Sequence, residues 1–360
     1  MRIIKSILSL IVIIFITSSF SLAQKQGIVI EEFIFEEAPF KECHASTIAE
    51  TPNGIVASWF GGTEEKNEDV EIWISRKVDG SWTKPVSIAN GIQNEKLRHP
   101  CWNPVLYQVP NGPLQNYYKV GPTPRDWWGL LIESNDGGIS WGDPVKLPDG
   151  ILGPIKNKPV LLSNGTLISP TSTEVKGEGW RVHFEYSDDF GKTWTKSKSI
   201  NDGKQYNAIQ PSVLIYPGDK LQIMARSKEN SVLSAWSSDF GKTWSGLKPS
   251  GLPNPNSGTD AVTLQDGRQL LVYNHVGKKP NKWGGKRSPL NVAISKDGIT
   301  WQAALVLEDK SGEYSYPSVI EAEDGKVHIV YTWKRDRVKH VVVDPTKLKS
   351  KPIVDGIWPE

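Results

Sequence analysis

Short runs of alternating apolar and polar residues recur along almost the whole chain. Runs of one kind lead into an Asn-Gly or Asp-Gly-like turn, which is typical of a β-strand that enters a hairpin. Six runs have this form: residues 47–54, 105–112, 160–165, 213–219, 261–267 and 319–325. A second apolar run follows each of them, as at residues 55–59 and 326–331. No convincing helical pattern intervenes, so the sequence predicts an all-β protein.

A third run then usually enters a repeated turn with the pattern Ser-x-Asp-x-Gly-x-Thr-Trp. The turn is nearly identical at residues 187–194 and 237–244, has Ser for Thr at 134–141, is one residue shorter at 295–301 and is degenerate at 75–82. Its Asp can bond backbone N–H groups, its Gly can take a positive φ, and its Trp can pin the turn to the sheet. The closing tryptophans recur at intervals of roughly 50 to 60 residues, which indicates stacked supersecondary units.

Six such units of about four strands predict a six-bladed β-propeller with antiparallel blades. Residues 27–35 are expected to close the ring by completing the last blade. Counts of five or seven blades stay open, because the final repeat lacks the turn. No linker or low-complexity stretch divides residues 24–360, so we expect one propeller domain there.

The first 23 residues have the form of a secretory signal peptide. A basic start with Arg2 and Lys5 precedes an apolar stretch, and Ser21-Leu22-Ala23 offers small residues at a cleavage site. A membrane anchor is the alternative, but the apolar run is marginal in length for one. We therefore expect an exported protein, periplasmic or extracellular, that has no membrane partner after cleavage.

Charge and motifs exclude several function classes. The formal net charge is only +2 and no basic run occurs, so nucleic acid is not an expected partner. No zinc spacing, phosphate-binding loop or Gly-x-Ser-x-Gly motif is present, and neither a metal nor a cofactor is expected. We interpret the Asp residues of the repeated turns as structural. A monomer is expected.

The only two cysteines, Cys43 and Cys101, hold the same place in successive repeats, 11 residues before Gly54 and Gly112. This predicts that they lie on neighbouring inner strands. In an oxidising compartment they could form a disulfide; two free buried thiols are the alternative.

A propeller gathers the starts of its inner strands at one central mouth. Residues eight to eleven places before the turn glycines should therefore meet near the axis. This rule selects Cys43, His44, Trp102, Ser257, Thr259, Ser315 and Tyr316.

The repeated turn resembles the Asp-box, or BNR, repeat of the sialidase superfamily, and the resemblance covers essentially all of the chain after the signal peptide. It implies an arginine triad that binds the substrate carboxylate, a nucleophilic Tyr, a Glu that assists it and an acid/base Asp. Arg226 and Arg287 match the second and third arginines, and a guanidinium fork suits a carboxylate. Tyr316 matches the nucleophile, with neighbouring Tyr314 as a competitor. Asp69 is a loose match to the acid/base.

Two positions depart from that pattern. His44 stands where the first arginine is expected, and Gln210 stands where the assisting Glu is expected. A free tyrosine has a pKa of about 10 and is a poor nucleophile at neutral pH without a base. A histidine titrates near 6.5 and suits proton transfer, so His44 or His99 could take over.

Three functions follow from these residues. The first is a sialidase-like glycoside hydrolase that removes an acidic sugar, or a sugar linked to one, from an oligosaccharide or polysaccharide. The second is a uronate-directed lyase, or a propeller enzyme that cleaves rhamnosyl-glucuronate linkages, working through His44. The third is a carbohydrate-binding propeller without catalysis, because the expected Arg and Glu are missing.

Further aromatic and polar residues could line a sugar-binding mouth, although packing between blades is the alternative for each. An aromatic ring can stack on a sugar face while polar groups bind its hydroxyls. The candidates are His99, Trp102, Tyr118, Lys119, Lys158 and His275. Lys158 follows Lys156 and Asn157, which could add positive potential at the mouth.

Overall fold

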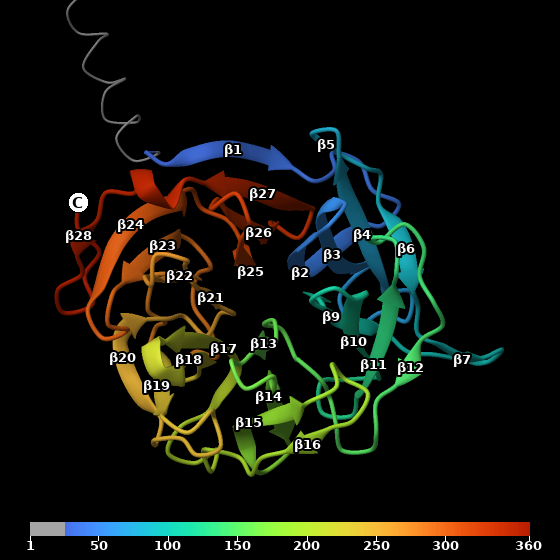
Figure 1. Ribbon diagram of the computed structural model, residues 1–360, viewed down its shortest axis with the longest axis horizontal. Helices are drawn as coiled ribbons and strands as arrows, with labels where there is room; N and C mark the ends of the chain where they lie inside the picture. Colours follow the sequence, from blue (N-terminus) through green and yellow to red (C-terminus); the bar gives the residue numbers. More distant parts are fainter. Residues whose placement is uncertain (1–25) are drawn as a thin grey trace, which may run out of the picture.

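Six antiparallel sheets surround a central axis in the computed structural model of the protein, which describes residues 26–360 (Figure 1). The prediction of an all-β, six-bladed propeller is confirmed. The only helical segments in the described part are two short 3-10 turns, Pro217–Asp219 and Pro345–Lys347. The predicted signal peptide lies outside the described residues. Within residues 26–360, no helix is long and apolar enough to cross a membrane.

The first three blades run from the axis outward in chain order. Blade 1 contains β2 (Glu42–Thr51), β3 (Gly54–Gly62), β4 (Glu71–Val78) and β5 (Ser81–Trp82), and β6 (Val86–Ala89) also pairs with β4. Blade 2 contains β9 (Cys101–Gln108), β10 (Leu114–Val120), β11 (Trp128–Ser134) and β12 (Val145–Lys146). Blade 3 contains β13 (Val160–Leu161), β14 (Leu167–Val175), β15 (Gly179–Ser187) and β16 (Thr195–Lys196). A separate hairpin, β7 (Ile92–Asn94) and β8 (Leu97–Arg98), projects from the ring between blades 1 and 2 (Figure 1).

The remaining blades repeat the plan with two additions. Blade 4 contains β17 (Ala208–Tyr216), β18 (Lys220–Ser227), β19 (Ser231–Ser237) and β20 (Lys248–Pro253). Blade 5 contains β21 (Asp260–Thr263), β22 (Gln269–Tyr273), β23 (Leu290–Ser295), β24 (Trp301–Glu308) and the added β28 (Lys351–Pro352). Blade 6 contains β25 (Tyr314–Glu321), β26 (Val327–Trp333), β27 (Arg337–Val343) and β1 (Ile28–Phe33).

Strand β1 closes the ring as predicted, since it pairs antiparallel with β27 and forms the outer strand of blade 6. Glu32 on β1 also bonds to blade 1. Its carboxylate accepts hydrogen bonds from Lys77, from Trp82 Nε1 at 2.9 Å and from the His340 ring at 2.8 Å. The closure therefore joins the first and last blades through side chains as well as through the sheet.

In blades 2 to 5, the repeated turn follows the third strand and leads to the fourth. In blade 3, Asp189 accepts hydrogen bonds from Thr193 N at 2.8 Å and Thr193 Oγ1 at 2.7 Å. Gly191, with φ 93°, takes the left-handed conformation that the turn requires, and its carbonyl accepts from Trp194 Nε1 at 2.9 Å. The turn is thus built by its own residues.

Each of these turns also binds the preceding blade. A backbone carbonyl of the turn accepts a hydrogen bond from a side chain one blade earlier: Asn53 to Asp136, Gln115 to Phe190, Tyr186 to Gly241 and Gln222 to Gly298, at 2.6–3.0 Å. The repeat therefore fixes the contact between blades as well as the end of each blade.

Four inner strands carry a β-bulge near their start. Ala45, Asn103, Gln210 and Tyr316 have φ values between 35° and 56°, and the register of each strand against its neighbour shifts there. A positive φ is unusual for residues other than glycine and occurs where a bulge redirects side chains. The bulges place Gln210 and Tyr316, two of the predicted site residues, at kinks on the inner strands.

The two cysteines lie on inner strands of adjacent blades, but both are free buried thiols. Cys43 packs with Ile34, Trp59 and Val338 between blades 6 and 1, whereas Cys101 packs in a different cluster with Tyr118. Because the two cysteines hold equivalent positions in successive blades, their side chains point in the same direction around the ring. Cys43 therefore lies at the interface of blades 6 and 1, and Cys101 lies at the interface of blades 1 and 2. This geometry agrees with the alternative of two free thiols.

Candidate functional site

The candidate site is centred on Tyr316, at the bulge of β25. Its ring lies against the ring of His44 on β2, with centroids 4.2 Å apart and planes inclined by 48°. Gly258 lies beside the ring, where an added Cβ would be 3.2 Å from Tyr316 Cδ2, so a larger residue there would require the ring to move slightly. Tyr316 and His44, which are far apart in the sequence, are thus held together as their repeat positions predict.

Arg226 on β18 points at the tyrosine hydroxyl and is 5% exposed. Its Nη1 donates a hydrogen bond of 2.8 Å to Tyr316 Oη, and its Nε donates one of 2.8 Å to Asn256 Oδ1. Among the described residues, no carboxylate forms an ion pair with this guanidinium. Its hydrogen-bond partners among the described residues are all neutral, and a buried arginine of this kind is suited to an anionic ligand.

Gln210 joins the same group from the bulge of β17. Its Nε2 lies 3.3 Å from Tyr316 Oη, and its Oε1 accepts a bond of 3.3 Å from Arg226 Nη1. The hydroxyl of Tyr316 therefore has two donors beside it, and an amide cannot act as its base.

The imidazole of His44 is buried and bonded through Nδ1 to Thr332 Oγ1 at 3.1 Å. Burial holds its pKa well below 6.5, and the positive charges of Arg335, Arg287, Arg226 and Lys156 lower it further. His44 is thus neutral at physiological pH, and the same surroundings disfavour its protonated form. No described residue hydrogen-bonds to its Nε2.

Arg287 lies in a neighbouring cleft of about 320 Å³, lined by Asn256, Trp283, Glu313 and Arg335 among others. Arg287 Nη1 donates to Glu313 Oε1 at 2.8 Å, and Arg335 Nε donates to the same oxygen at 3.2 Å. Burial would raise the pKa of Glu313, but Arg287 and Arg335 outweigh that effect and hold it below its usual value. The cleft thus contains two arginines that share one carboxylate.

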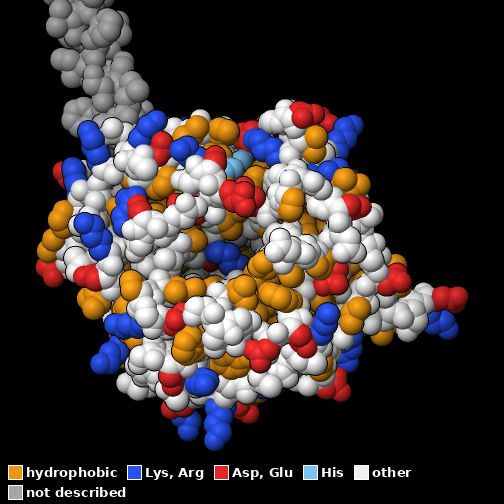
Figure 2. Space-filling model, in the orientation of Figure 1, with side chains coloured by type: hydrophobic (Ala, Val, Ile, Leu, Met, Phe, Trp, Pro, Cys, Tyr) orange, Lys and Arg blue, Asp and Glu red, His pale blue; other side chains and the backbone are white. Residues whose placement is uncertain are grey.

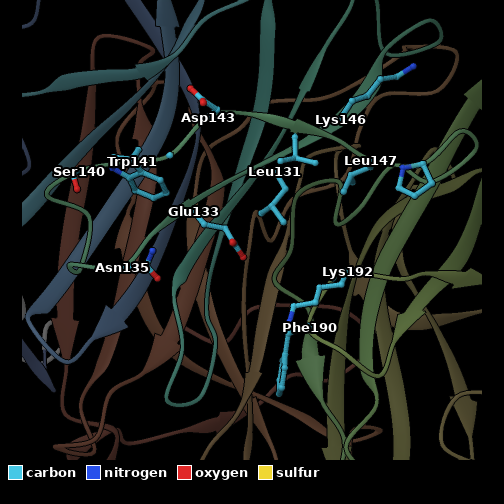
Figure 3. A pocket seen from close by; sticks show the side chains of 14 residues that line it. Leu131, Glu133, Asn135, Ser140, Trp141, Asp143, Lys146, Leu147, Phe190 and Lys192 are labelled. Carbon is cyan, nitrogen blue, oxygen red and sulfur yellow. The ribbon is translucent and has the colours of Figure 1, made fainter.

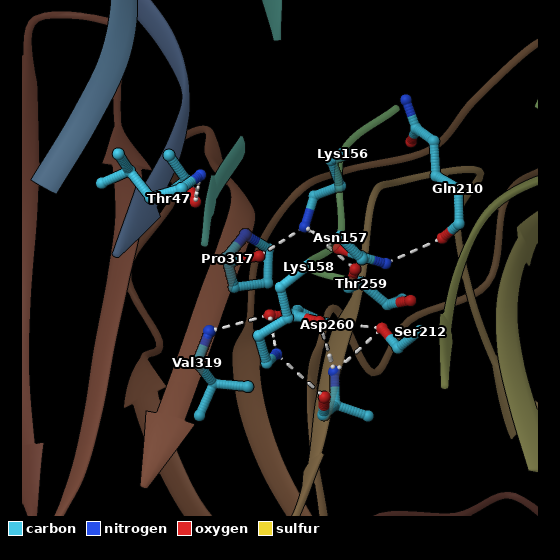
Figure 4. Close-up of polar contacts among 12 residues, drawn as sticks. Thr47, Lys156, Asn157, Lys158, Gln210, Ser212, Thr259, Asp260, Pro317 and Val319 are labelled. Atoms are coloured by element: carbon cyan, nitrogen blue, oxygen red, sulfur yellow. Dashed lines mark hydrogen bonds and ion pairs between the residues drawn. The ribbon is translucent and has the colours of Figure 1, made fainter. Parts of the chain in front are cut away.

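A polar network fills the axis beside the site (Figure 4). Lys156 Nζ donates to Asn157 Oδ1 at 2.8 Å, to the Thr259 carbonyl at 3.0 Å and to the Pro317 carbonyl at 2.5 Å. Lys158 Nζ donates to Asp260 Oδ2 at 2.9 Å. The network connects blades 3, 5 and 6, and the bond to Pro317 supports the backbone next to Tyr316.

The centre of one face of the ring is hollowed, and basic side-chain atoms are visible inside the hollow (Figure 2). The basic residues around Tyr316 and the cleft form the central group with it: Arg226, Arg287, Arg335, Lys156 and Lys158. The nearby carboxylates are Asp260, Glu313, Glu65 and Glu174, the last of which interacts electrostatically with Arg226. A local positive potential therefore exists at the axis although the whole chain is nearly neutral.

Several predicted sugar-binding residues have other partners. Trp102 is buried and donates to the Gly121 carbonyl at 2.8 Å, Tyr118 is fully buried, and Lys119 donates to the Pro154 carbonyl at 2.5 Å. Burial lowers the pKa of Lys119 to about 7. These three residues pack within and between blades, which is the alternative the sequence left open.

The two remaining histidine candidates lie apart from Tyr316. His275 Nε2 donates a hydrogen bond of 2.9 Å to the Gly356 carbonyl, and its Nδ1 is bonded to the Tyr273 hydroxyl. Burial lowers the pKa of His275 to about 4. His99 is half-buried and packs edge-on against Trp128. No described contact joins either ring to the central group.

Asp69, the acid/base candidate, is exposed on the loop between β3 and β4. Its Oδ2 accepts hydrogen bonds from Thr63 N at 2.9 Å and Thr63 Oγ1 at 2.5 Å. These bonds hold the carboxylate at its loop, and no described hydrogen bond or ion pair joins it to Tyr316.

A groove of about 650 Å³ lies away from the axis, between the outer turns of blades 2 and 3 (Figure 3). Figure 3 shows Glu133 and Leu131 from β11 on one side and Phe190 and Lys192 on the other. None of the central group lines it. Cavity size alone therefore does not locate the candidate site.

Sequence reasoning did not select Glu313, Arg335 or Asn256. They lie in connections outside the regular strand repeats, where the mouth rule and the family pattern provide no guidance. The charged run Lys334-Arg335-Asp336-Arg337 at the end of blade 6 was the one available signal.

The fold and the central group of Tyr316, Arg226 and Arg287 define a propeller of the sialidase superfamily. A profile described as "BNR repeat-like domain" matches residues 53–329, so the chain belongs to that family. It is 26% identical over 350 residues to a sialidase from Bacteroides fragilis (strain YCH46), covering 82% of this chain and 60% of that protein. It is 25% identical over 233 residues to the anhydrosialidase of Macrobdella decora, covering 57% of this chain and 30% of that protein. The chain thus spans less than two thirds of the length of these relatives.

Solved structures agree in fold. The Trypanosoma rangeli sialidase aligns with a TM-score of 0.63 at 20% identity, covering 85% of this chain and 55% of that one. A protein of unknown function from Dyadobacter fermentans DSM 18053 aligns with a TM-score of 0.72 at 18% identity, covering 90% and 99%. These likenesses show that the chain has the fold of a sialidase-like propeller.

Proposed function

We propose that the protein is an exported glycoside hydrolase that removes an acidic sugar, sialic or uronic, from glycans. The observation that carries the proposal is Arg226, a buried guanidinium that donates a hydrogen bond of 2.8 Å to the hydroxyl of Tyr316 and whose hydrogen-bond partners among the described residues are all neutral. An anionic substrate group bound there lies next to a nucleophile. Sialidases among the relatives support the same class of chemistry.

In this proposal Tyr316 attacks the anomeric carbon and its proton passes to the neutral ring of His44. Asp69 protonates the leaving oxygen and later activates water, which releases the sugar from Tyr316. His44 thereby takes over the task that Gln210 cannot perform. Arg226 and Arg287 hold the acidic group of the substrate.

A second candidate is β-elimination at a uronate, favoured by the neutral ring of His44 beside Tyr316. Here His44 removes the proton from C5, and the C4–C5 double bond forms as the bond from C4 to the glycosidic oxygen breaks. Tyr316 gives its hydroxyl proton to that leaving oxygen. The product contains an unsaturated uronate that absorbs in the ultraviolet, whereas hydrolysis leaves none.

The deciding experiment incubates the protein with sialyl glycosides and with glucuronate-containing oligosaccharides. Released sugar and ultraviolet absorbance are both recorded. Release of an acidic sugar without absorbance supports hydrolysis, and absorbance supports elimination. Glycan binding without turnover of either set would overturn both and leave a carbohydrate-binding propeller.

A further inference from the structure

The turn between β26 and β27 places an arginine beside strand β2. Arg335 has a left-handed conformation with φ 63°, and its carbonyl accepts a hydrogen bond of 2.8 Å from the N–H of Cys43. Cys43 immediately precedes His44. The backbone of Arg335 is therefore fixed next to the position where His44 stands in place of an arginine.

The side chain of Arg335 enters the cleft that contains Arg287. Its Nη1 donates to Glu65 Oε2 at 2.6 Å and its Nε to Glu313 Oε1 at 3.2 Å. Its side chain retains 24% exposure, as does that of Arg287, so both guanidinium groups remain accessible from the cleft. Two carboxylates on opposite sides thus aim the group without covering it.

The way these residues hold Glu313 shows what the cleft can bind. A single carboxylate oxygen accepts from both Arg287 and Arg335, and Ser315 Oγ lies 3.1 Å from it. Asn256, which lines the same cleft, binds Arg226 through its Oδ1. Asn256 thus connects Arg226 to the cleft of Arg287 and Arg335. Among residues 26–360, Glu65 and Glu313 are the only ion-pair partners of the three arginines.

We propose that Arg335 supplies the guanidinium that His44 lacks, so that Arg226, Arg287 and Arg335 together bind the acidic group of the substrate. This inference rests on the proposed function and names the residue that determines its preference for an acid. Among the neighbouring charges, Arg335 is the largest influence on the lowered pKa of His44, which agrees with its closeness to that ring. Glu313 is the counter-ion that keeps Arg287 and Arg335 in position.

The test measures binding of free N-acetylneuraminate and D-glucuronate, each against its methyl ester, to the wild type and to Arg335→Gln. The wild type is expected to prefer the acid of one pair. In Arg335→Gln the ratio of the affinity for the acid to that for the ester should fall about tenfold. The reason is that the charge-assisted hydrogen bonds from the guanidinium to the carboxylate are lost. Arg337→Gln is the matched control: Arg337 lies two residues further along and pairs with the exposed Glu36. It should keep the wild-type preference.

A second variant covers the case in which Arg335→Gln does not fold. Arg335→Lys keeps the charge but not the planar fork, and should reduce the preference several-fold. If the folded variants keep the full wild-type preference, the role of Arg335 is wrong while the proposed function stands. If the wild type itself binds acid and ester equally, the proposed function fails first.

Discussion

At the scale of single residues, the account depends on the hydroxyl of Tyr316. Tyr316→Phe removes the proposed nucleophile and should lower kcat by at least about a hundredfold, while binding of the acidic sugar changes little. Tyr314→Phe is the control, because Tyr314 lies two residues earlier and packs in the core between blades 5 and 6. Steady-state kinetics check both. Equal activity of the two variants would contradict the assignment.

The pair of His44 and Gln210 gives a second residue-scale prediction. His44→Ala should reduce kcat strongly, because the proposed mechanism passes the proton of Tyr316 to this ring. Adding Gln210→Glu to that variant brings a carboxylate to the position 3.3 Å from Tyr316 Oη and should restore kcat about tenfold. It should also raise KM, since the carboxylate competes for Arg226. A double variant no faster than His44→Ala would contradict this role.

The pH dependence of activity follows from the same ring. His44 has a lowered pKa, so it is neutral above its folded-state pKa and loses its function only when pH falls below that value. The acidic limb of kcat should therefore lie clearly below 6.5. The contrary result is an acidic limb with its midpoint at or above pH 6.5 in the wild type that is absent from the pH profile of His44→Ala. It would show that the ring is not buried as described.

Sequence patterns located part of this site and missed the rest for a physical reason. Tyr316, His44 and Gln210 sit at fixed places in repeated strands, so the repeat brings them to the axis. Arg335 and Glu313 reach the cleft through loops whose direction depends on tertiary contacts such as the bond from Cys43 to Arg335. The missing arginine at position 44 was therefore evident in the sequence, whereas the position of Arg335 next to it was not.

At the scale of elements, the repeated turn is a structural device. Asp189→Ala leaves the N–H groups of Lys192 and Thr193 without their acceptor and should lower the free energy of unfolding by about 1–2 kcal/mol. Catalysis should be unaffected, because the turn lies on the outer side of blade 3. Urea unfolding and kinetics measure the two effects.

The adjacent Asp188 is the matched control for that turn. It accepts one bond from Thr166 and none from the turn backbone, so Asp188→Ala should cost less than half as much. Equal losses would mean that the turn gains no special stability from its Asp.

The strands were predictable because alternation and turn residues are local signals. All six predicted inner strands correspond to inner strands of the fold, from β2 to β25. The bulges at Gln210 and Tyr316 were not, because a positive φ at such residues reflects packing around the axis. The same limit applies to the cysteines. Their positions on neighbouring inner strands were predicted correctly, but the direction of each side chain depends on how the blades pack around the axis.

At the scale of the whole molecule, ring closure depends on Glu32. Burial would raise its pKa, but hydrogen bonds from His340, Lys77 and Trp82 outweigh this and lower the pKa from 4.5 to about 2. A depressed carboxyl pKa contributes stability that is present above the unfolded pKa and is lost as pH falls toward about 2. Glu32→Gln should therefore cost about 1–2 kcal/mol at pH 7 and less at pH 2.5. Chemical unfolding at both pH values checks this, and an equal loss at both would contradict it.

The measurement that tests the central claim most directly is the mass of the Tyr316 peptide during turnover. The enzyme is quenched in acid while it cleaves an acidic-sugar glycoside with a good aryl leaving group, so that release of the sugar from the enzyme limits the rate. The account predicts that the peptide containing Tyr316 carries one sugar residue, and that Tyr316→Phe carries none. Steady turnover with that peptide unmodified would contradict it.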